Sequence, residues 1–324
     1  MANVLLTGAS GFVGGHLLHE LLVNGHKVRA LLRSAVSDAQ LANAGAEPVR
    51  GSLQDQCALN AACQNMDAVF HCAANTSAWS RDRETQNETN IAGTQRLLAA
   101  AEANGVACFV HTSSVSAYSH LVEETLTETL PQRGGESWIN YERSKYLGEQ
   151  AVRQASLPYL VFNPSHVLGP GDRNNWARLV KMVHDGTLPG VPPGSGAFAD
   201  VREIAKAQVR AWQSGLRNES FLLGGSHASF LEFVQLAAQL SGRPLARRAM
   251  PKAVLRIVGQ LSEMTAAVTG KMPQITPAAV AMTCHHLKVD SGKAIAQLGY
   301  RETPLPQLMA DTLAWMRAEG MVTA

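Results

Sequence analysis

The sequence predicts an α/β protein whose core is a Rossmann-type doubly wound parallel sheet, joined to a smaller, helix-rich C-terminal substrate-binding region. Two observations carry this prediction. Short β-rich runs alternate with helical patterns through the first half of the 324-residue chain. This rhythm is typical of βαβ units, with helices on both faces of a parallel sheet. A glycine-rich segment also joins the first strand to the first helix, where proteins of this architecture bind ligands.

Five short runs are rich in β-branched and apolar residues, and we expect each of them to form a strand. They span residues 3–6, 28–32, 68–71, 108–111 and 159–162. Helical spacing fills several of the gaps between them, as in the sets Leu17, Leu18, Leu21, Leu22 and Ile91, Leu97, Leu98, Ala101. Right-handed crossovers between such strands would place all their carboxyl ends along one edge of the sheet.

The character of the sequence changes after about residue 163. We expect residues 1–163 to form a dinucleotide-binding Rossmann domain. Residues 164–324 would form mainly a substrate-binding cap, interleaved with the last strands of the sheet. Residues 185–196 are dense in Gly and Pro and predict a loop within this second part.

Two helical patterns follow in the second part, at about 230–240 and 252–268. The second pattern repeats large apolar residues on one face: Val254, Ile257, Val258 and Leu261. A stripe at this spacing usually packs in a protein core, so we expect it to be buried there and not to contact a membrane.

Composition excludes several classes of function. Lys and Arg number 28 and Asp and Glu 26, which leaves a formal net charge of +2, and no basic run indicates nucleic-acid binding. The apolar stretches are interrupted by charge before the ~18 residues that a membrane span requires. The N-terminus reads as a strand and not as a signal peptide. Five cysteines without a CxxC pair predict reduced thiols, no metal site and a cytoplasmic protein.

The clearest binding motif follows the first predicted strand, where residues 7–14 read TGASGFVG. Gly8 permits a tight turn, Gly11 lets backbone N–H groups approach a pyrophosphate, and Gly14 lets the next helix pack closely. The N-terminus of that helix offers free N–H groups and a positive dipole end to phosphates. We therefore expect a dinucleotide to bind against Gly8, Ser10, Gly11, Phe12, Val13 and Gly14.

The end of the second strand indicates which dinucleotide binds. An NAD-selective site normally places an acidic residue there for the ribose 2′-hydroxyl, but no acid occurs before Asp38. Arg33 stands at this point instead, followed by Ser34. A guanidinium can pair with a 2′-phosphate, so the sequence favours NADP, with NAD as the alternative.

A tyrosine and a lysine four residues apart, Tyr141 and Lys145, predict the catalytic chemistry. On a helix they share one face. The ordinary pKa of tyrosine is about 10, and a fixed positive charge nearby would lower it toward the range of proton exchange. The third candidate is Ser114 at the end of the strand at 108–111, where it would hold the substrate oxygen. Ser113 is the competing serine.

Motifs along nearly the whole chain resemble the extended short-chain dehydrogenase/reductase superfamily, the NAD(P)-dependent epimerase/dehydratase family. They are TGASGFVG at 7–14, VFHCAA at 69–74, NIAGT at 90–94, HTSSVSAY at 111–118, YERSKYLGE at 141–149, NPSHVLGPGD at 163–172, FADVREIA at 198–205 and the C-terminal DS, KA and LGY at 290–300. Within the superfamily the chain is most similar to the dihydroflavonol-4-reductase-like proteins, next to nucleotide-sugar epimerases and 3β-hydroxysteroid dehydrogenases.

The resemblance implies roles for individual residues. Ser114, Tyr141 and Lys145 would be the catalytic triad. Besides the glycine turn and Arg33, the implied cofactor-binding residues are Ser52, Leu53, Ala73, Ala74, Asn90, Tyr141, Lys145, Pro164, Ser165, His166 and Val167. Two positions depart from the family pattern: Ser52 stands where an aspartate often touches adenine, and Asn163 stands where an arginine is common.

The predicted reaction is the NADP-dependent reduction of a small-molecule carbonyl, or the oxidation of the corresponding alcohol. The nicotinamide would carry the hydride and Tyr141 the proton, while Ser114 orients the oxygen and Lys145 tunes Tyr141. One alternative is a nucleotide-sugar epimerase or dehydratase, in which the cofactor is reduced only transiently. A second is a non-catalytic NADP-binding regulator, which has no need of the triad.

Several further residues are candidates for substrate contact. A nucleotide sugar needs a cationic clamp for its diphosphate, and Arg173, Arg178 and Lys181 either supply it or form a solvated helix face. His71 and His111 are expected in the core, His166 either in the core or at the substrate, and Trp79, Trp138 and Trp176 either at the substrate or in packing. The resemblance also predicts a homodimer built from the helices at about 91–103 and 141–154.

Overall fold

The computed structural model describes the chain except residues 35–37, 244–247, 274 and 324. Its centre is a parallel sheet with the strand order β3-β2-β1-β4-β5-β6-β9, seven strands within the described residues. The strands are β1 (Asn3–Thr7), β2 (Lys27–Leu32), β3 (Glu47–Arg50), β4 (Ala68–His71), β5 (Cys108–Thr112), β6 (Tyr159–Pro164) and β9 (Glu219–Leu223). The predicted doubly wound parallel sheet is confirmed.

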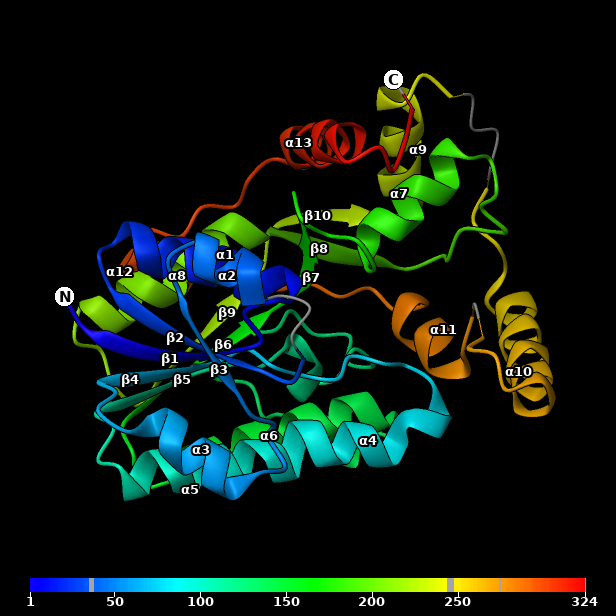
Figure 1. Cartoon of the computed structure of the whole chain (residues 1–324). Coiled ribbons are helices and arrows are strands. Elements are labelled where there is room, and N and C mark those ends of the chain that lie inside the picture. The colour runs from blue at the N-terminus through cyan, green and yellow to red at the C-terminus, as the bar shows by residue number, and fades with distance from the viewer. Residues whose placement is uncertain (35–37, 244–247, 274, 324) are drawn as a thin grey trace.

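Helices cover both faces of this sheet (Figure 1). On one face lie α1 (Phe12–Val23), α2 (Asp38–Asn43), α8 (Val201–Gln213) and α12 (Gly292–Leu298), and on the other α3 (Gln56–Cys63), α4 (Arg83–Asn87), α5 (Gly93–Ala103) and α6 (Asn140–Gln154). The strands between them read as continuous apolar runs, because both of their faces are buried. Strand order reverses between β1 and β4, which opens a crevice at the carboxyl edge.

The five predicted strands agree with β1, β2, β4, β5 and β6 to within two residues at either end. The two edge strands, β3 and β9, were not predicted. β3 reads Glu-Pro-Val-Arg and carries neither alternation nor an apolar run. Its proline is tolerated because an edge strand leaves one row of N–H groups unpaired.

The second part of the chain builds its own small layer beside the main sheet. Strands β10 (Ser226–Ser229), β8 (Ser195–Asp200) and β7 (His166–Leu168) pair in that order, under α7 (Trp176–His184), α9 (Phe230–Leu240) and α13 (Leu305–Ala318). Phe198, Phe230 and Phe233 form the centre of its core. The two parts interleave, because β9 and α8 come from the second half of the sequence but belong to the main sheet.

Helix α10 (Lys252–Thr269) overturns one prediction. The apolar stripe expected in the core is exposed: Val254 to 41%, Ile257 to 58%, Val258 to 37% and Leu261 to 58%. The helix instead packs on α11 (Pro277–Thr283) through a different face, which carries Leu255, Gly259 and Ala266. The periodicity correctly indicated an apolar face on this helix, but it is a second and narrower face that packs against α11.

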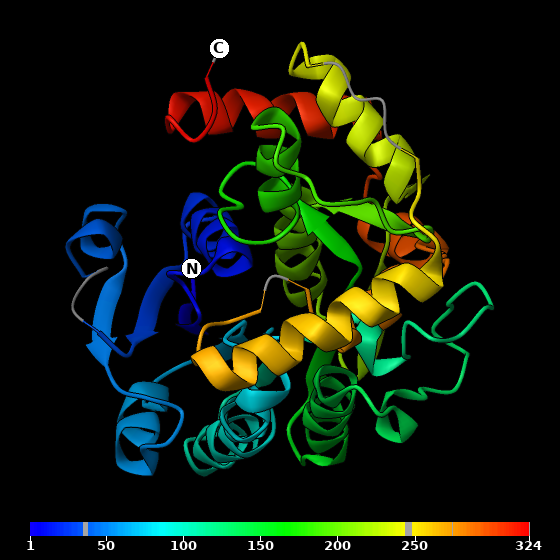
Figure 2. The same ribbon diagram turned by 90° about the vertical axis from the view of Figure 1, so that its right-hand side faces the viewer.

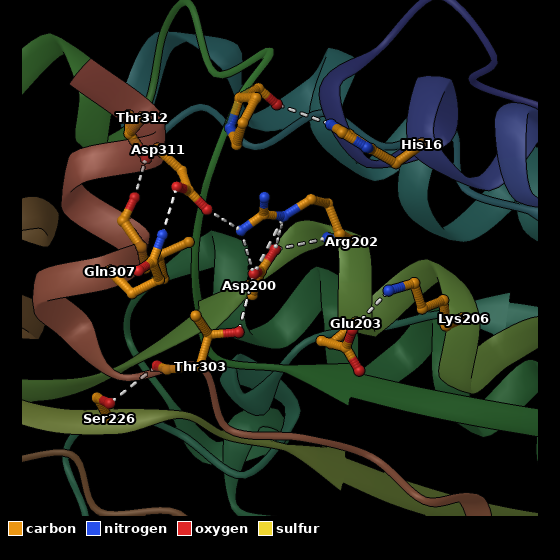
Figure 3. Close-up of polar contacts among 12 residues, drawn as sticks. His16, Asp200, Arg202, Glu203, Lys206, Ser226, Thr303, Gln307, Asp311 and Thr312 are labelled. Carbon is orange, nitrogen blue, oxygen red and sulfur yellow. Dashed lines mark hydrogen bonds and ion pairs between the residues drawn. The ribbon is translucent and has the colours of Figure 1, made fainter. Parts of the chain in front are cut away.

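An ion-pair cluster ties α13 to the junction of β8 and α8 (Figure 3). The Arg202 guanidinium donates to Asp200 and to Asp311, both at 2.7 Å, and Thr303 donates to Asp200 at 2.9 Å. Burial alone would raise the pKa of Asp200, but hydrogen bonds and the charge of Arg202 hold it below its ordinary value. In the described part of the chain, no helix is long and apolar enough to cross a membrane.

We expect Arg202→Met to lower the free energy of unfolding by about 2 kcal/mol at pH 7, because it leaves the buried Asp200 carboxylate without its partner. Asp200 has a depressed pKa when folded, so its stabilisation is present above about pH 4 and is lost as the pH falls through the folded value. The difference in unfolding free energy between wild type and variant should therefore become smaller as the pH falls, as measured by urea unfolding.

Lys181→Met is the matched control, because it removes an exposed ion pair with Asp185 that should contribute little. Two results would contradict the role given to Arg202. One is a difference in unfolding free energy between wild type and Arg202→Met that does not change with pH, and the other is a loss of stability no larger than that of the control.

Candidate active site

The turn between β1 and α1 has no space for a side chain at two of its glycines. Gly8 has φ of +79°, and a Cβ on it would lie 2.7 Å from the backbone nitrogen of Ala73. A Cβ on Gly14 would overlap the carbonyl oxygen of Gly8. Both positions therefore require glycine for the fold itself, since side chains there have neither space nor, at Gly8, an allowed backbone conformation.

Gly11 differs, because a Cβ there would meet only the Gly8 carbonyl, at 3.2 Å. Gly11 is also the N-cap of α1, whose first turn has no capping side chain and no acidic residue. Ser10 and Gly11 are exposed, while Phe12 and Val13 are half-buried. The free N–H groups of this helix end fit the pyrophosphate of a dinucleotide.

The other predicted cofactor-binding residues follow the neighbouring strands along the same carboxyl edge. Arg33 and Ser34 come directly after β2 and are exposed. Ser52 and Leu53 follow β3, and Ala73 and Ala74 follow β4. Within the described residues Arg33 has no ion pair, which leaves its guanidinium available to a ligand.

Asn90 lies in a π-helical turn, Glu88–Ala92, between α4 and α5. Its side-chain amide holds the backbone of Asn75 in the loop after β4, accepting from the Asn75 N–H at 2.8 Å and donating to the Asn75 carbonyl at 2.9 Å. It also donates to the Ser144 hydroxyl on α6 at 2.9 Å. Asn90 therefore fixes the loop that carries Ala73 and Ala74.

Glu149 is a fully buried carboxylate on α6 that binds the ends of two strands. It accepts from Ser113 at the end of β5 at 2.6 Å and from Asn163 in β6 at 2.7 Å. Gln132 at 2.6 Å and Arg153 at 2.7 Å satisfy its other oxygen. Asn163, which departs from the family pattern, thus acts inside the protein, where it also donates to the Ser114 carbonyl at 3.0 Å.

This network separates the two competing serines. The Ser113 hydroxyl is committed to Glu149, whereas the Ser114 hydroxyl faces the Tyr141 phenol. Ser114 also caps the short 3-10 helix Val115–Ala117 by accepting from the Ser116 N–H at 3.1 Å. Ser114 therefore both caps this 3-10 helix and faces Tyr141.

The pKa of Tyr141 is raised above its ordinary value, because burial outweighs the hydrogen bonds that Ser114 and Ser116 offer the phenolate. The predicted lowering of this pKa depends on Lys145 together with an oxidised nicotinamide. Here the Lys145 ammonium instead donates to the Thr112 carbonyl at 3.2 Å. Burial lowers the pKa of Lys145 to about 8, with Cys72 and Glu149 opposing the shift.

Sequence reasoning missed three residues beside the triad: Ser116, His120 and Glu142. The Ser116 hydroxyl bonds both the Ser114 hydroxyl, at 3.1 Å, and His120 Nε2, at 2.9 Å. The buried Glu142 carboxylate accepts from the His120 N–H at 2.7 Å. Ser116 lies inside the HTSSVSAY motif, so its spacing of two residues from Ser114 was available as a signal, but the long-range contact of Glu142 was not.

A pocket opens beside Tyr141 at the carboxyl edge. Its lining residues are Ser77, Ala78, Trp79, Ser80, Arg83, Gln86, Trp138, Ile139, Asn140, Tyr141, Glu263, Pro277 and Ala278. Two of the three predicted tryptophans, Trp79 and Trp138, are among them. The third, Trp176, packs with Phe198 and Phe230 in the core of the second part.

The remaining candidates lie elsewhere. His166 is buried in the same aromatic core, 4.5 Å from the Trp176 ring centre, on the strand that follows Pro164 and Ser165. Of the proposed cationic clamp, Arg173 pairs with Glu319 and Lys181 with Asp185. His71 and His111 are buried in the core as predicted. The described residues contain no cluster of three metal ligands.

Comparison with known proteins gives a consistent result. Residues 4–224 match the model of the NAD dependent epimerase/dehydratase family. A 2-alkyl-3-oxoalkanoate reductase of Stenotrophomonas maltophilia is 31% identical over 79% of this chain and 76% of its own. A putative dihydroflavonol 4-reductase of Synechocystis is 29% identical over 98% and 95%. The crystal structure of gox2253 superposes with a TM-score of 0.84 at 29% identity, with full coverage of both chains.

We expect Gly11→Val to weaken dinucleotide binding by about a hundredfold or more while the protein stays folded. The branched side chain would stand between the phosphates and several N–H donors, each charge-assisted bond being worth about 1.5–3 kcal/mol. Calorimetric titration with NADP and NAD measures the loss, and thermal melts check the fold.

Gly15→Ala is the control, because a Cβ there meets only the Ala9 carbonyl, at an ordinary 3.7 Å, and it should bind as the wild type does. A folded Gly11→Val protein with unchanged affinity would show that the turn has a structural role only.

Proposed function

The chain belongs to the NAD dependent epimerase/dehydratase family and is an NAD(P)-dependent enzyme of the extended short-chain dehydrogenase/reductase type, and on this premise we propose that it reduces the carbonyl of a small apolar molecule with NADPH, or runs the reverse oxidation. The observation that carries the proposal is the position of Tyr141: it lines the pocket, it shares helix α6 with Lys145, and its phenolate would be stabilised by Ser114 and Ser116.

The proton chemistry follows from the surroundings of Tyr141. Its raised pKa keeps the phenol protonated at neutral pH, as a proton donor must be. The Ser114 hydroxyl, supported by Ser116, orients the substrate oxygen toward the Tyr141 Oη. Lys145, largely protonated at neutral pH, would hold the nicotinamide ribose and stabilise the phenolate left after proton transfer. A nicotinamide, when bound, supplies or accepts the hydride.

The end of β2 supports NADP over NAD. Arg33 is exposed, and no acid precedes it in the strand to repel a phosphate. A guanidinium binds phosphate bidentately and strongly. The adjacent Ser34 hydroxyl adds a further donor.

The pocket supports a reductase over a nucleotide-sugar epimerase. Trp79, Trp138 and Ile139 give it apolar walls, and Arg83 is the cation among the described lining residues. The candidates for a diphosphate clamp, Arg173, Arg178 and Lys181, all lie outside this lining, and Arg173 and Lys181 are held in ion pairs. The 2-alkyl-3-oxoalkanoate reductase, a relative by sequence, has a ketone and an alkyl group in its named substrate, which is the substrate class that we propose.

Two further expectations stay predictions. The homodimer would use the outer faces of α5 and α6, where Leu147 is 44% exposed. The cytoplasmic location follows from five cysteines that are all free, with Cys63 and Cys108 buried.

We expect Tyr141→Phe to lower turnover of any accepted ketone by roughly 10²–10⁴-fold, because it removes the general acid but keeps the ring. Its affinity for NADPH should barely change. Lys145→Met should differ by weakening both turnover and NADPH binding. Steady-state kinetics and fluorescence titration separate the two effects, and melts with and without NADPH check folding. Wild-type turnover by Tyr141→Phe would show that another group is the acid.

We expect the affinity for NADP to exceed that for NAD, and Arg33→Ala to lower the NADP affinity roughly 10–100-fold with little effect on NAD. Arg243→Ala removes an exposed arginine far from β2 in the sequence and should change neither. Equal loss of both dinucleotides in Arg33→Ala, or no loss of either, would count against the 2′-phosphate contact.

A further inference from the structure

Helix α10 presents a continuous apolar surface to solvent. Besides the four residues of the predicted stripe, Met264 is 67% exposed, Val268 88%, and Met272 just beyond the helix 60%. We name these seven residues the α10 stripe: Val254, Ile257, Val258, Leu261, Met264, Val268 and Met272. Scattered single apolar residues are normal on a surface, but a contiguous set of this size usually marks an interaction site.

On an ordinary surface helix the large apolar residues face the protein. Helix α10 has the opposite arrangement. The face against α11 is narrow and carries Leu255, Gly259 and Ala266, with the Gly259 backbone close to Val280. Most of the large apolar side chains of the helix lie away from this face and are exposed. A helix that only covered a core would turn its large apolar residues inward, because their removal from water drives packing. The α10 stripe is therefore suited to an apolar phase outside the protein.

The segment that carries the α10 stripe is cationic. The segment 248–272 carries Arg248, Lys252, Arg256 and Lys271 against one carboxylate, Glu263. Arg248, Arg256 and Lys271 are exposed, whereas Lys252 is half-buried and contacts His285 Nε2 at 3.4 Å. Glu263 is half-buried and accepts a hydrogen bond from Ser80, so its charge is turned toward the protein. An exposed apolar stripe in a segment with three exposed cations matches the chemistry of an anionic lipid surface.

The helix lies across the carboxyl edge of the sheet, on the side of the molecule that holds the pocket. Figure 2 looks at this side and shows α10, in gold, crossing the front of the molecule with nothing over it. Glu263 lines the same pocket as Tyr141, together with Pro277 and Ala278 of α11. A surface bound to the α10 stripe would therefore adjoin the mouth of this pocket.

We propose that α10 is an in-plane anchor that docks this edge of the protein on an anionic lipid bilayer. Its 18 residues would lie along the interface for about 27 Å with the stripe inserted and the cations at the headgroups. A second copy of the chain fits less well, because a two-fold contact through the stripe would bring the cations of both copies together. The proposal goes beyond the proposed reaction and does not depend on it.

Co-sedimentation with vesicles tests the proposal. We expect the full-length protein to bind phosphatidylcholine vesicles containing about one-third phosphatidylglycerol, and to bind pure phosphatidylcholine and high-salt samples more weakly. The double variant Ile257→Glu/Leu261→Glu should lose about tenfold or more of this binding. Ile257→Gln/Leu261→Gln should also lose binding, which would show that lost insertion, and not only repulsion, is responsible.

Val23→Glu and Ile295→Glu are matched controls, since these residues are 61% and 47% exposed on α1 and α12. Both should bind vesicles as the wild type does, and all variants should keep NADPH affinity, which shows that they are folded. Absence of wild-type binding, or equal binding by the α10 variants, overturns the proposal. A wild type that sediments as an oligomer and α10 variants that sediment as smaller species would assign the stripe to a second copy and overturn it as well.

Discussion

The site depends on the buried carboxylate of Glu149 and the donors that neutralise it. An uncompensated charge at this depth would cost several kcal/mol, so its hydrogen bonds to Ser113, Asn163, Gln132 and Arg153 hold α6 and the ends of β5 and β6 in one arrangement. On the same helix, Lys145 lies about one turn and Tyr141 about two turns before Glu149. The position of Tyr141 and Lys145 relative to Ser114 is thus set by the hydrogen bonds of Glu149, a buried residue outside the site itself.

The carboxyl edge joins two halves that are held together in different ways. The half formed by the glycine turn, Asn90 and α6 is held by close backbone contacts and buried polar networks. The half formed by α10 and α11 packs through a narrow face that carries Leu255, Gly259 and Ala266. Groups that must be held in place for proton transfer lie on the first half, whereas the second half adds Glu263, Pro277 and Ala278 to the pocket lining and carries the exposed stripe. A site divided in this way can change its substrate without disturbing its chemistry.

Much of the fold could be predicted because buried parallel strands leave continuous apolar runs and the glycine turn has strict steric needs. The edge strand β3 escaped, since Glu47 and Pro48 leave no such run. Spacing found Tyr141 and Lys145 on one helix face, but the raised pKa of the phenol depends on burial, which spacing does not encode. The exposed α10 stripe could not be foreseen, because periodicity identifies an apolar face and not what covers it.

A double-mutant cycle on turnover tests most directly whether Glu149 acts by positioning Tyr141. Glu149→Gln keeps the shape of the side chain but weakens its hold on Ser113 and Asn163, and it should lower turnover about tenfold or more with intact NADPH binding. In the Tyr141→Phe background the same change should have almost no further effect, because the group being positioned is gone. Losses that multiply in the double variant, or a folded Glu149→Gln enzyme with wild-type turnover, would contradict the account.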